Sequence, residues 1–549
     1  MLKKHSVLDV PWLREKGMQH GLRYGLIIAL VSTVSACSLG TQHGTYDPLF
    51  WDSGLSDMEA RFELAKRSEP ELIAFLRRMP KGSDLHNHLS GATYSDYLLD
   101  SAKANGLNYN LANDRFTDEK VDGQVIAFDT LVSNSTYYAH FLDTYSMRGW
   151  YSNTTNGHDH FFNTFNYMSS ARRSGAEQLA EVIRRNLYQN IEYAEFMTST
   201  APQELSDALD KAMASFDSDD FGLEQLEACF TATETVRKDP HWSKAIRDYI
   251  GKRQDDSYAL LDEATRQRVT GKNPELIIRY IPQLYRTVPL KRFFRDAVAA
   301  MMSVEADPRI VAVNMVQAED DPHSRWQFDA QMKILDFLWT RMGKPNIALH
   351  AGELVLQGSP VEPMWNRIRD SIEIGHAKRI GHGVAIAWSR DVVGLLEEMR
   401  RRHVLVEICL SSNESILGVA GKAHPFMLYR RAGVPVSLNT DDEGVSRSTL
   451  TEEFVKAVER YPLSYRDLKD LARNSIEYAF LPGTGLYENH DYTRLRPEFL
   501  DVRNPEWQST SLQKELLAAD PKLEREVRLE RAFIDFERNL AQGFREPAN

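Results

Sequence analysis

The chain has 549 residues, of which 42% are hydrophobic and 26% are charged, and its formal net charge is −12. This composition allows a full hydrophobic core. The acidic balance argues against a general nucleic-acid-binding protein, because no basic surplus is available to neutralise phosphates. Three cysteines (Cys37, Cys229 and Cys409) are too few for a disulfide framework, and none of them forms a CxxC pair.

The first 37 residues have the pattern of a bacterial lipoprotein signal peptide. Residues 22–34 are almost entirely apolar, and the run is too short to span a bilayer comfortably. It ends in the sequence Val-Ser-Ala-Cys, which resembles a lipobox in which Cys37 is lipidated. We therefore expect a lipid anchor in the cell envelope of a bacterium, at the outer membrane or the periplasmic face. Translation from Met1 or from Met18 fits equally, and an apolar helix before a buried cysteine is the alternative.

Residues 38–80 are expected to form a tether and a helical extension that ends at Pro80. Short apolar segments then alternate with longer amphipathic ones, such as 325–342, 390–402 and 450–460. The expected strands are 84–88, 191–196, 276–281, 310–316, 347–350, 379–382, 404–409 and 434–438. Eight successive strand–helix units predict an α/β fold of the (β/α)8 TIM-barrel type over residues 81–482.

Three stretches exceed a minimal barrel. Residues 101–160 and 201–270 are predicted to be helical insertions over the barrel mouth or side, and they leave open a partner or a homodimer. Residues 483–549 are predicted to be a C-terminal extension with one charged helix over 511–542. A second HxH pair in the first insertion, His158 and His160, is expected in a surface loop.

Chemically capable residues fall at the carboxyl ends of the expected strands, where barrel enzymes place their catalytic groups. His86 and His88 end the first strand, and alternate residues of a strand share one face, so both imidazoles can bind one metal. His350 ends the fifth strand, and Glu353 follows it after Gly352, which permits a tight turn. Taken singly, these could be ordinary polar residues of strand ends and loops.

His382 ends the sixth strand between two glycines, and Asp441 and Asp442 follow the eighth. Adjacent carboxylates at a strand end are costly unless a positive group lies there, and they point in different directions. A loop histidine without a role and a helix-capping pair are the alternatives. Three histidines and one aspartate nevertheless make a plausible zinc site with a position left for water.

The order HxH, HAGE, GHG and SLNTDD resembles the adenosine deaminase family of metal-dependent hydrolases, over about residues 79–482. The lead-in Met-Pro-Lys-Gly at 79–82 resembles the secreted adenosine deaminase-related growth factor branch. The order of motifs in the family alone selects Asp441 over Asp442 as the carboxylate ligand. The resemblance implies one zinc ion per chain, held by His86, His88, His350 and Asp441.

The resemblance further implies hydrolytic deamination of a purine nucleoside, adenosine or a modified adenosine, to the inosine form and ammonia. His382 and Asp441 would orient and deprotonate the attacking water, which the metal activates. Glu353 would protonate the purine at N1, and Asp442 would hydrogen-bond N7. The remaining substrate-binding residues expected are Gly352, Ser90 and Gln317.

Four positions depart from the family pattern. Ser90 replaces an aspartate that contacts the ribose 5′ hydroxyl, and Gln317 replaces a glycine that meets the purine. Glu443 and Leu410 replace two prolines. A neutral Ser90 would tolerate a modified 5′ group, and the longer Gln317 would intrude into the pocket or make a new polar contact, so adenosine need not be the best substrate.

Two other functions are alternatives for such a chain. A binuclear amidohydrolase of the same barrel class generally needs a bridging lysine at the end of the fourth strand, and no lysine lies near 313–320. A non-catalytic, deaminase-like binding protein should have lost part of the constellation, whereas every member is present here. Both considerations favour a mononuclear enzyme.

Overall fold

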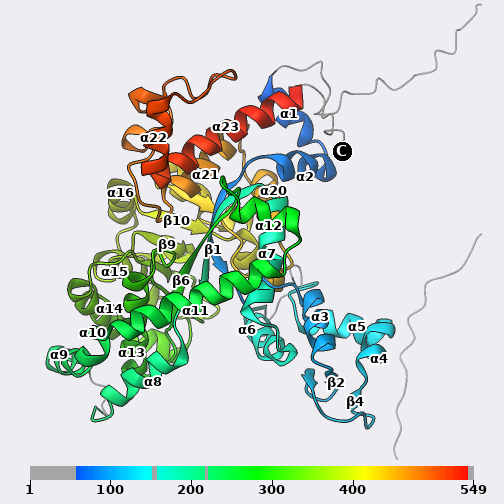
Figure 1. Ribbon diagram of the computed structural model, residues 1–549, viewed down its shortest axis with the longest axis vertical. Coiled ribbons are helices and arrows are strands. Elements are labelled where there is room, and N and C mark those ends of the chain that lie inside the picture. The colour runs from blue at the N-terminus through cyan, green and yellow to red at the C-terminus, as the bar shows by residue number, and fades with distance from the viewer. Residues whose placement is uncertain (1–56, 151–156, 217–220, 542–549) are drawn as a thin grey trace, which may run out of the picture. The chain divides into compact units, whose positions relative to one another are not determined.

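The computed structural model describes residues 57–150, 157–216 and 221–541 (Figure 1). The predicted signal peptide, its Cys37 and most of the tether lie outside these residues. Within the described ranges, no helix combines the length and the apolar character needed to cross a membrane.

Eight parallel strands form the centre of the fold. They pair as two four-stranded sheets, in the orders β1-β5-β6-β7 and β11-β10-β9-β8. Single parallel bridges, Asn87 with Asp441 and Val313 with Ile347, join the two sheets at both edges, so that the barrel closes. The strands are β1 (Gly82–His88), β5 (Ile191–Thr198), β6 (Ile277–Tyr285), β7 (Asn314–Val316), β8 (Ala348–Ala351), β9 (Arg379–His382), β10 (Leu405–Ile408) and β11 (Val436–Leu438). The predicted (β/α)8 barrel is confirmed, and each strand overlaps one expected segment.

Helices alternate with these strands because their apolar faces cover the sheet. α7 and α21 each begin with a capping box, formed by Ser174 with Glu177 and by Ser464 with Asp467. The expected helices are present as α14, α16 and α20. The helices of the barrel are α7 (Gly175–Tyr188), α13 (Leu290–Ala306), α14 (Pro322–Arg341), α15 (Arg367–Glu373), α16 (Val392–Arg402), α17 (Leu410–Leu417), α18 (Phe426–Arg431), α19 (Glu443–Ser446), α20 (Leu450–Arg460) and α21 (Tyr465–Glu477).

The first insertion leaves the carboxyl end of β1 and is not purely helical, contrary to expectation. A small antiparallel sheet, β2 (Asn108–Asn110), β3 (Arg115–Thr117) and β4 (Val125–Ile126), packs with α3 (Ser95–Ala104), α4 (Phe128–Ser133) and α5 (Ser135–Thr144) around a core of its own. Strands of two or three residues are too short to produce a visible alternation in the sequence. His158 and His160 lie in α6 (Gly157–Met168) and not in a loop, which corrects that prediction.

The second insertion follows β5 and is helical over its described residues. α11 packs against α7 and α13, and α8 also packs against α13, so this insertion covers the side of the barrel. Its helices are α8 (Gln203–Ala212), α9 (Leu223–Ala232), α10 (Glu234–Lys238), α11 (Pro240–Ala259) and α12 (Glu263–Thr270).

Both extensions contain one more helix than expected. The N-terminal run divides into α1 (Met58–Ala65) and α2 (Glu69–Arg78), because the Ser68 hydroxyl caps a new helix. The expected helix over 511–542 divides into α22 (Ser511–Ala519) and α23 (Pro521–Ala541), because Pro521 has no N–H to continue the first one. α23 packs against α21 and β5. Short 3-10 helices occur at Ser169–Ala171, Glu362–Met364, Val384–Trp388, Gly421–Ala423, Glu488–His490 and Pro497–Phe499.

Candidate active site

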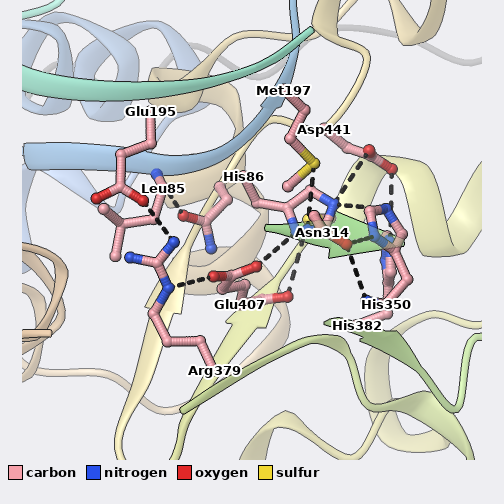
Figure 2. Close-up of polar contacts among 12 residues, drawn as sticks. Leu85, His86, Glu195, Met197, Asn314, His350, Arg379, His382, Glu407 and Asp441 are labelled. Atoms are coloured by element: carbon pink, nitrogen blue, oxygen red, sulfur yellow. Dashed lines mark hydrogen bonds and ion pairs between the residues drawn. The ribbon is translucent and has the colours of Figure 1, made fainter. Parts of the chain in front are cut away.

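Four buried side chains from β1, β8 and the end of β11 converge at the mouth of the barrel: His86, His88, His350 and Asp441. Figure 2 labels three of them, His86, His350 and Asp441. The Nε2 atom of His350 lies 3.0 Å from Nε2 of His86 and 3.1 Å from Nε2 of His88. The Oδ1 atom of Asp441 lies 3.4 Å and 3.2 Å from the same two nitrogens. Lone pairs packed this closely repel one another unless a cation lies between them, and three imidazoles with one carboxylate suit zinc.

The orientation of His86 is set by a buried ionic chain that Figure 2 shows. Its Nδ1 atom lies 2.6 Å from Oε2 of Glu407, a carboxylate that can only accept, so Nδ1 carries the proton. The other oxygen of Glu407 lies 2.6 Å from Nε of Arg379, which also contacts Glu195. Although burial opposes a charge on the ring, Asp441 and Glu407 raise the pKa of His86 to about 10. The pocket therefore favours a positive charge at this point.

His350 is oriented in a similar way by neutral partners. Its Nδ1 atom lies 2.8 Å from Oδ1 of Asn314, whose amide nitrogen contacts the sulfur of Met197 at 3.3 Å. Arg286 donates to the carbonyl of His350 at 3.0 Å. In His86 and His350 the outer nitrogen is occupied and Nε2 faces the centre, which is the usual arrangement of metal-binding histidines.

A second possible group, His382, Cys409 and Asp441, fits a metal less well. Burial, with help from nearby carboxylates, raises the pKa of the Cys409 thiol well above its ordinary value. The first group offers three imidazoles and a carboxylate, whereas the second offers one imidazole, so the three-histidine group is the better candidate for a metal.

His382 and Glu353 flank the four ligands. The Nε2 atom of His382 lies 3.7 Å from Glu353 and 3.9 Å from Oδ2 of Asp441, and it has no hydrogen-bond partner among the described residues. Oδ2 of Asp441 accepts from the hydroxyl of Ser412 at 2.6 Å. His382 and Asp441 have φ values of 65° and 59°, in the left-handed region that non-glycine residues rarely adopt. Such backbone is typical of functional sites.

A tight turn presents Glu353 to the cavity. Gly352 has a φ of +75°, and a Cβ there would lie 2.8 Å from Ile368. The Glu319 carboxylate accepts from the backbone N–H groups of Gly352 at 3.1 Å and of Glu353 at 2.7 Å. Burial and the carboxylates of Asp441 and Glu319 raise the pKa of Glu353 to about 8. Glu353 is therefore suited to donate a proton, and a bound cation would bring its pKa closer to neutrality.

Asp442 faces the same cavity in a different environment. Its Oδ1 atom is buried and has no partner among the described residues. Burial and the neighbouring Asp441 raise its pKa well above the ordinary value, which favours the protonated form that can donate a hydrogen bond. Gly91 makes room for it, because a Cβ on that glycine would lie 1.6 Å from Oδ1.

These groups form the floor of a cavity of about 470 Å³. The walls come from the ends of β1, β6 and β7 and from α6, and the described residues that line them include no lysine or arginine. Beyond the floor, the lining residues are Ser90, Phe161, Phe162, Phe165, Asn166, Gln283, Tyr285, Thr287, Val316, Gln317, Ala318 and Ile416. Gly352 lies beside this cavity, next to its lining residue Glu353.

The structure locates the four residues that depart from the expected pattern and gives three of them a hydrogen bond or ion pair. Gln317 keeps a glycine-like φ of 81°, and its side-chain oxygen accepts from Thr287, so it makes a polar contact at the cavity wall. Ser90 is an exposed lining residue. The N–H of Leu410, which proline would lack, donates to Glu453 at 2.6 Å. The carboxylate of Glu443 pairs with Arg185 at 3.1 Å.

Sequence reasoning missed the residues that support the ligands: Glu407, Asn314, Ser412 and Glu319. A signal existed for the first two, because Glu407 and Asn314 are polar residues inside otherwise apolar strands. Buried polar groups of that kind need partners. The sequence did not say which partners, since Glu407 and His86 are 321 residues apart.

The family model that matches this chain is that of adenosine deaminase, and two curated relatives that match it are adenosine deaminases. The adenosine deaminase family model matches residues 264–488. The adenosine deaminase of Enterococcus faecalis is 38% identical over 136 residues, which are 25% of this chain and 37% of that enzyme. The adenosine deaminase of Shewanella halifaxensis is 36% identical over 135 residues, 24% of this chain and 38% of that enzyme. These alignments therefore span little more than a third of the curated enzymes' length.

Solved structures with a similar fold are more distant in sequence. An adenine deaminase from Arthrobacter aurescens is 17% identical, with a TM-score of 0.46, over 73% of this chain and 94% of that one. An Arabidopsis N6-mAMP deaminase is 16% identical, with a TM-score of 0.45, over 74% and 96%. An amidohydrolase from Burkhoderia ambifaria with bound Zn is 16% identical, with a TM-score of 0.45, over 75% and 88%.

Proposed function

We propose that this chain, which belongs to the adenosine deaminase family through residues 264–488, is a zinc hydrolase that removes the 6-amino group of a purine nucleoside. One observation carries the proposal. Three of the four candidate metal ligands, His88, His350 and Asp441, line the same cavity as Glu353 and Asp442, two carboxyl groups whose pKa values burial raises. That combination fits hydrolysis at a ring carbon flanked by basic nitrogens.

Each side chain has a task in this reaction. Zinc bound by His86, His88, His350 and Asp441 would lower the pKa of a water molecule from 15.7 toward about 7. Glu353 gives its proton to N1 of the purine, which relieves the charge that develops on the ring. N7 of a purine only accepts hydrogen bonds, so a protonated Asp442 is the appropriate partner. His382 and Asp441 lie where they can orient the attacking oxygen and take its proton.

The cavity wall favours a neutral nucleoside. Lysine and arginine are common partners of a 5′-phosphate, and the described lining offers neither. The aromatic side chains of α6 and Tyr285 suit the apolar surface of a neutral nucleoside. The neutral Ser90 would accept a modified 5′ group. We therefore propose adenosine or a neutral 5′-modified adenosine as the substrate, in preference to AMP.

Ammonia release from a substrate panel tests this function. The panel is adenosine, 2′-deoxyadenosine, 5′-modified adenosines, adenine and AMP, each with zinc-loaded protein. We expect nucleosides to react and the neutral 5′-modified ones to react at least as well as adenosine. A preference for AMP would contradict the inference that the cavity wall favours a neutral nucleoside. A large preference for adenosine would contradict the role given to Ser90.

We further propose that the mature protein is anchored in a bacterial envelope through lipid on Cys37. The support is the lipobox-like sequence that precedes this cysteine. Stable attachment would need more than one acyl chain. Expression of the full chain with labelled palmitate should label the wild type and leave Cys37→Ala unlabelled and released from membranes. Equal labelling of the two proteins would contradict the lipidation of Cys37.

A further inference from the structure

The ring nitrogen of His382 that points away from the cavity is held by a short chain of buried hydrogen bonds. Nδ1 of His382 lies 3.0 Å from Nδ2 of Asn413, a residue of α17. Oδ1 of Asn413 lies 3.0 Å from Nε2 of His424. The backbone nitrogen of Phe426, at the start of α18, lies 3.1 Å from Nδ1 of His424. All three side chains are buried.

The backbone fixes the direction of every bond in this chain. The N–H of Phe426 can only donate, so Nδ1 of His424 accepts. A neutral imidazole has one N–H, so His424 carries its proton on Nε2 and donates it to Oδ1 of Asn413. Burial, with a contribution from Arg460, lowers the pKa of His424 to about 3, in keeping with a neutral ring.

Asn413 must then present its amide N–H to His382. A flipped amide would place its nitrogen against Nε2 of His424, and both nitrogens of His424 would have to accept, which a neutral ring cannot do. Nδ1 of His382 is therefore the acceptor. Its single proton lies on Nε2, the atom that faces Glu353 and Asp441 and has no partner among the described residues.

We propose that Asn413 and His424 are positioning residues that hold His382 as the Nε2–H tautomer, so that His382 donates a hydrogen bond to the attacking oxygen and Asp441 takes its proton. This assignment rests on the proposed deamination. His382 and Asp441 then have different tasks, whereas the family resemblance assigned the orientation and deprotonation of the water to both together.

The protons balance in this scheme. Water forms the bond to C6, one of its protons moves to Oδ2 of Asp441, and Glu353 protonates N1. The amino group takes the proton back from Asp441, the C6–N bond breaks, and ammonia leaves. The remaining hydroxyl proton returns to Glu353, which yields the 6-oxo, N1–H product.

Neutron diffraction from crystals of deuterated, zinc-loaded protein reads the tautomer directly. We expect deuterium on Nε2 of His382 and none on its Nδ1, with deuterium on Nε2 of His424. Deuterium on Nδ1 of His382, alone or together with Nε2, would overturn the proposal. This readout does not depend on turnover, so it stands or falls separately from the proposed function.

Two pairs of variants test the consequence for catalysis. Asn413→Asp keeps the shape but offers only acceptors, so a hydrogen bond to His382 now requires a proton on Nδ1 and the Nε2–H tautomer is no longer enforced. We expect kcat to fall on the order of 10²-fold with KM unchanged, the usual cost of a lost donor. His424→Gln, which keeps an N–H donor, should recover most of the kcat that His424→Leu loses. Wild-type kcat in Asn413→Asp, or equal losses in both His424 variants, would contradict the proposal.

Discussion

At the scale of single residues, the site depends on partners that hold each ligand in one orientation. The carboxylate of Glu407 lies between His86 and Arg379, at 2.6 Å from each. The neighbouring cation keeps the pKa of Glu407 below its ordinary value despite burial, so it remains a carboxylate that accepts the Nδ1 proton of His86. Nε2 of His86 is thereby left free for a metal.

Glu407→Gln should weaken zinc binding by about 10- to 100-fold, because the neutral amide orients His86 less strongly. Competition with a zinc-binding dye measures this. Glu453→Gln is the matched control, since Glu453 is also fully buried but bonds the N–H groups of Leu410 and Ser411. Equal zinc affinities in the wild type and Glu407→Gln would show that Glu407 does not support zinc binding.

Leu410→Pro restores the residue that the resembled family carries, and we expect it to destabilise this chain. Proline suits the first position of a helix such as α17, so the main loss is the N–H bond to Glu453. Leaving that buried acceptor short of a donor costs about 1–3 kcal/mol in free energy of unfolding. In a Glu453→Ala background the cost should largely vanish. A cost that persists there would indicate strain instead.

The candidate ligands were predictable from the sequence because each lies at or just after the carboxyl end of a predicted strand, and strand ends of a barrel meet. Their supporting residues were not, because contacts such as Glu407 with His86 join parts of the chain 321 residues apart. The reasons for Leu410 and Glu443 also emerge only in three dimensions, where Glu453 and Arg185 meet them.

At the scale of elements, α6 forms one wall of the cavity through Phe161, Phe162 and Phe165. It is joined to the loop after β7 by His158, whose Nε2 lies 3.0 Å from Asp320. His158 and His160 were predicted to lie in a loop because the first turn of this helix, Gly157 to His160, is polar. Its apolar residues line the cavity or pack in the core of the first insertion, and α6 packs against α17.

The pairing with Asp320, and then with Asp159, raises the pKa of His158 to about 9 from its ordinary 6.5. The ion pair is therefore complete below about pH 6.5 and is lost as the pH rises through about 9. We expect KM to rise over that upper range in the wild type. In His158→Gln, KM should be raised already at neutral pH and should not rise further as the pH increases through about 9.

His160→Gln serves as the control for that measurement. His160 bonds the carbonyl of Ser146 and stacks on Trp150, and it does not line the cavity. Its KM should follow pH as the wild type does. Identical pH profiles for the wild type and His158→Gln would show that the ion pair does not hold α6 in place.

At the scale of the whole molecule, the ligands also close the barrel. Asp441 forms the bridge between β1 and the end of β11 through Asn87, and His350 lies across from both on β8. The barrel was predictable because eight apolar segments recur in order with helices between them. The small sheet of the first insertion and the extra helix breaks were not, since they depend on two- or three-residue strands and single capping residues.

Because zinc would join β1, β8 and β11, its removal should lower the melting temperature. Zinc at 1,000 times its dissociation constant stabilises a protein by about 4.1 kcal/mol. Differential scanning calorimetry before and after chelation measures the loss, and zinc should restore it. His350→Ala, which lacks one ligand, should respond much less to added zinc. An equal response would place the ion elsewhere.

The most direct test of the account compares the wild type with Glu353→Gln, measuring zinc content and ammonia release from adenosine on the same samples. We expect one zinc per chain in both proteins. Ammonia should be released by the wild type and reduced by about 10² to 10⁴-fold in the variant, the range for loss of a general acid. Zinc-loaded wild type that releases no ammonia from any purine nucleoside, or Glu353→Gln with unchanged turnover, would contradict the account.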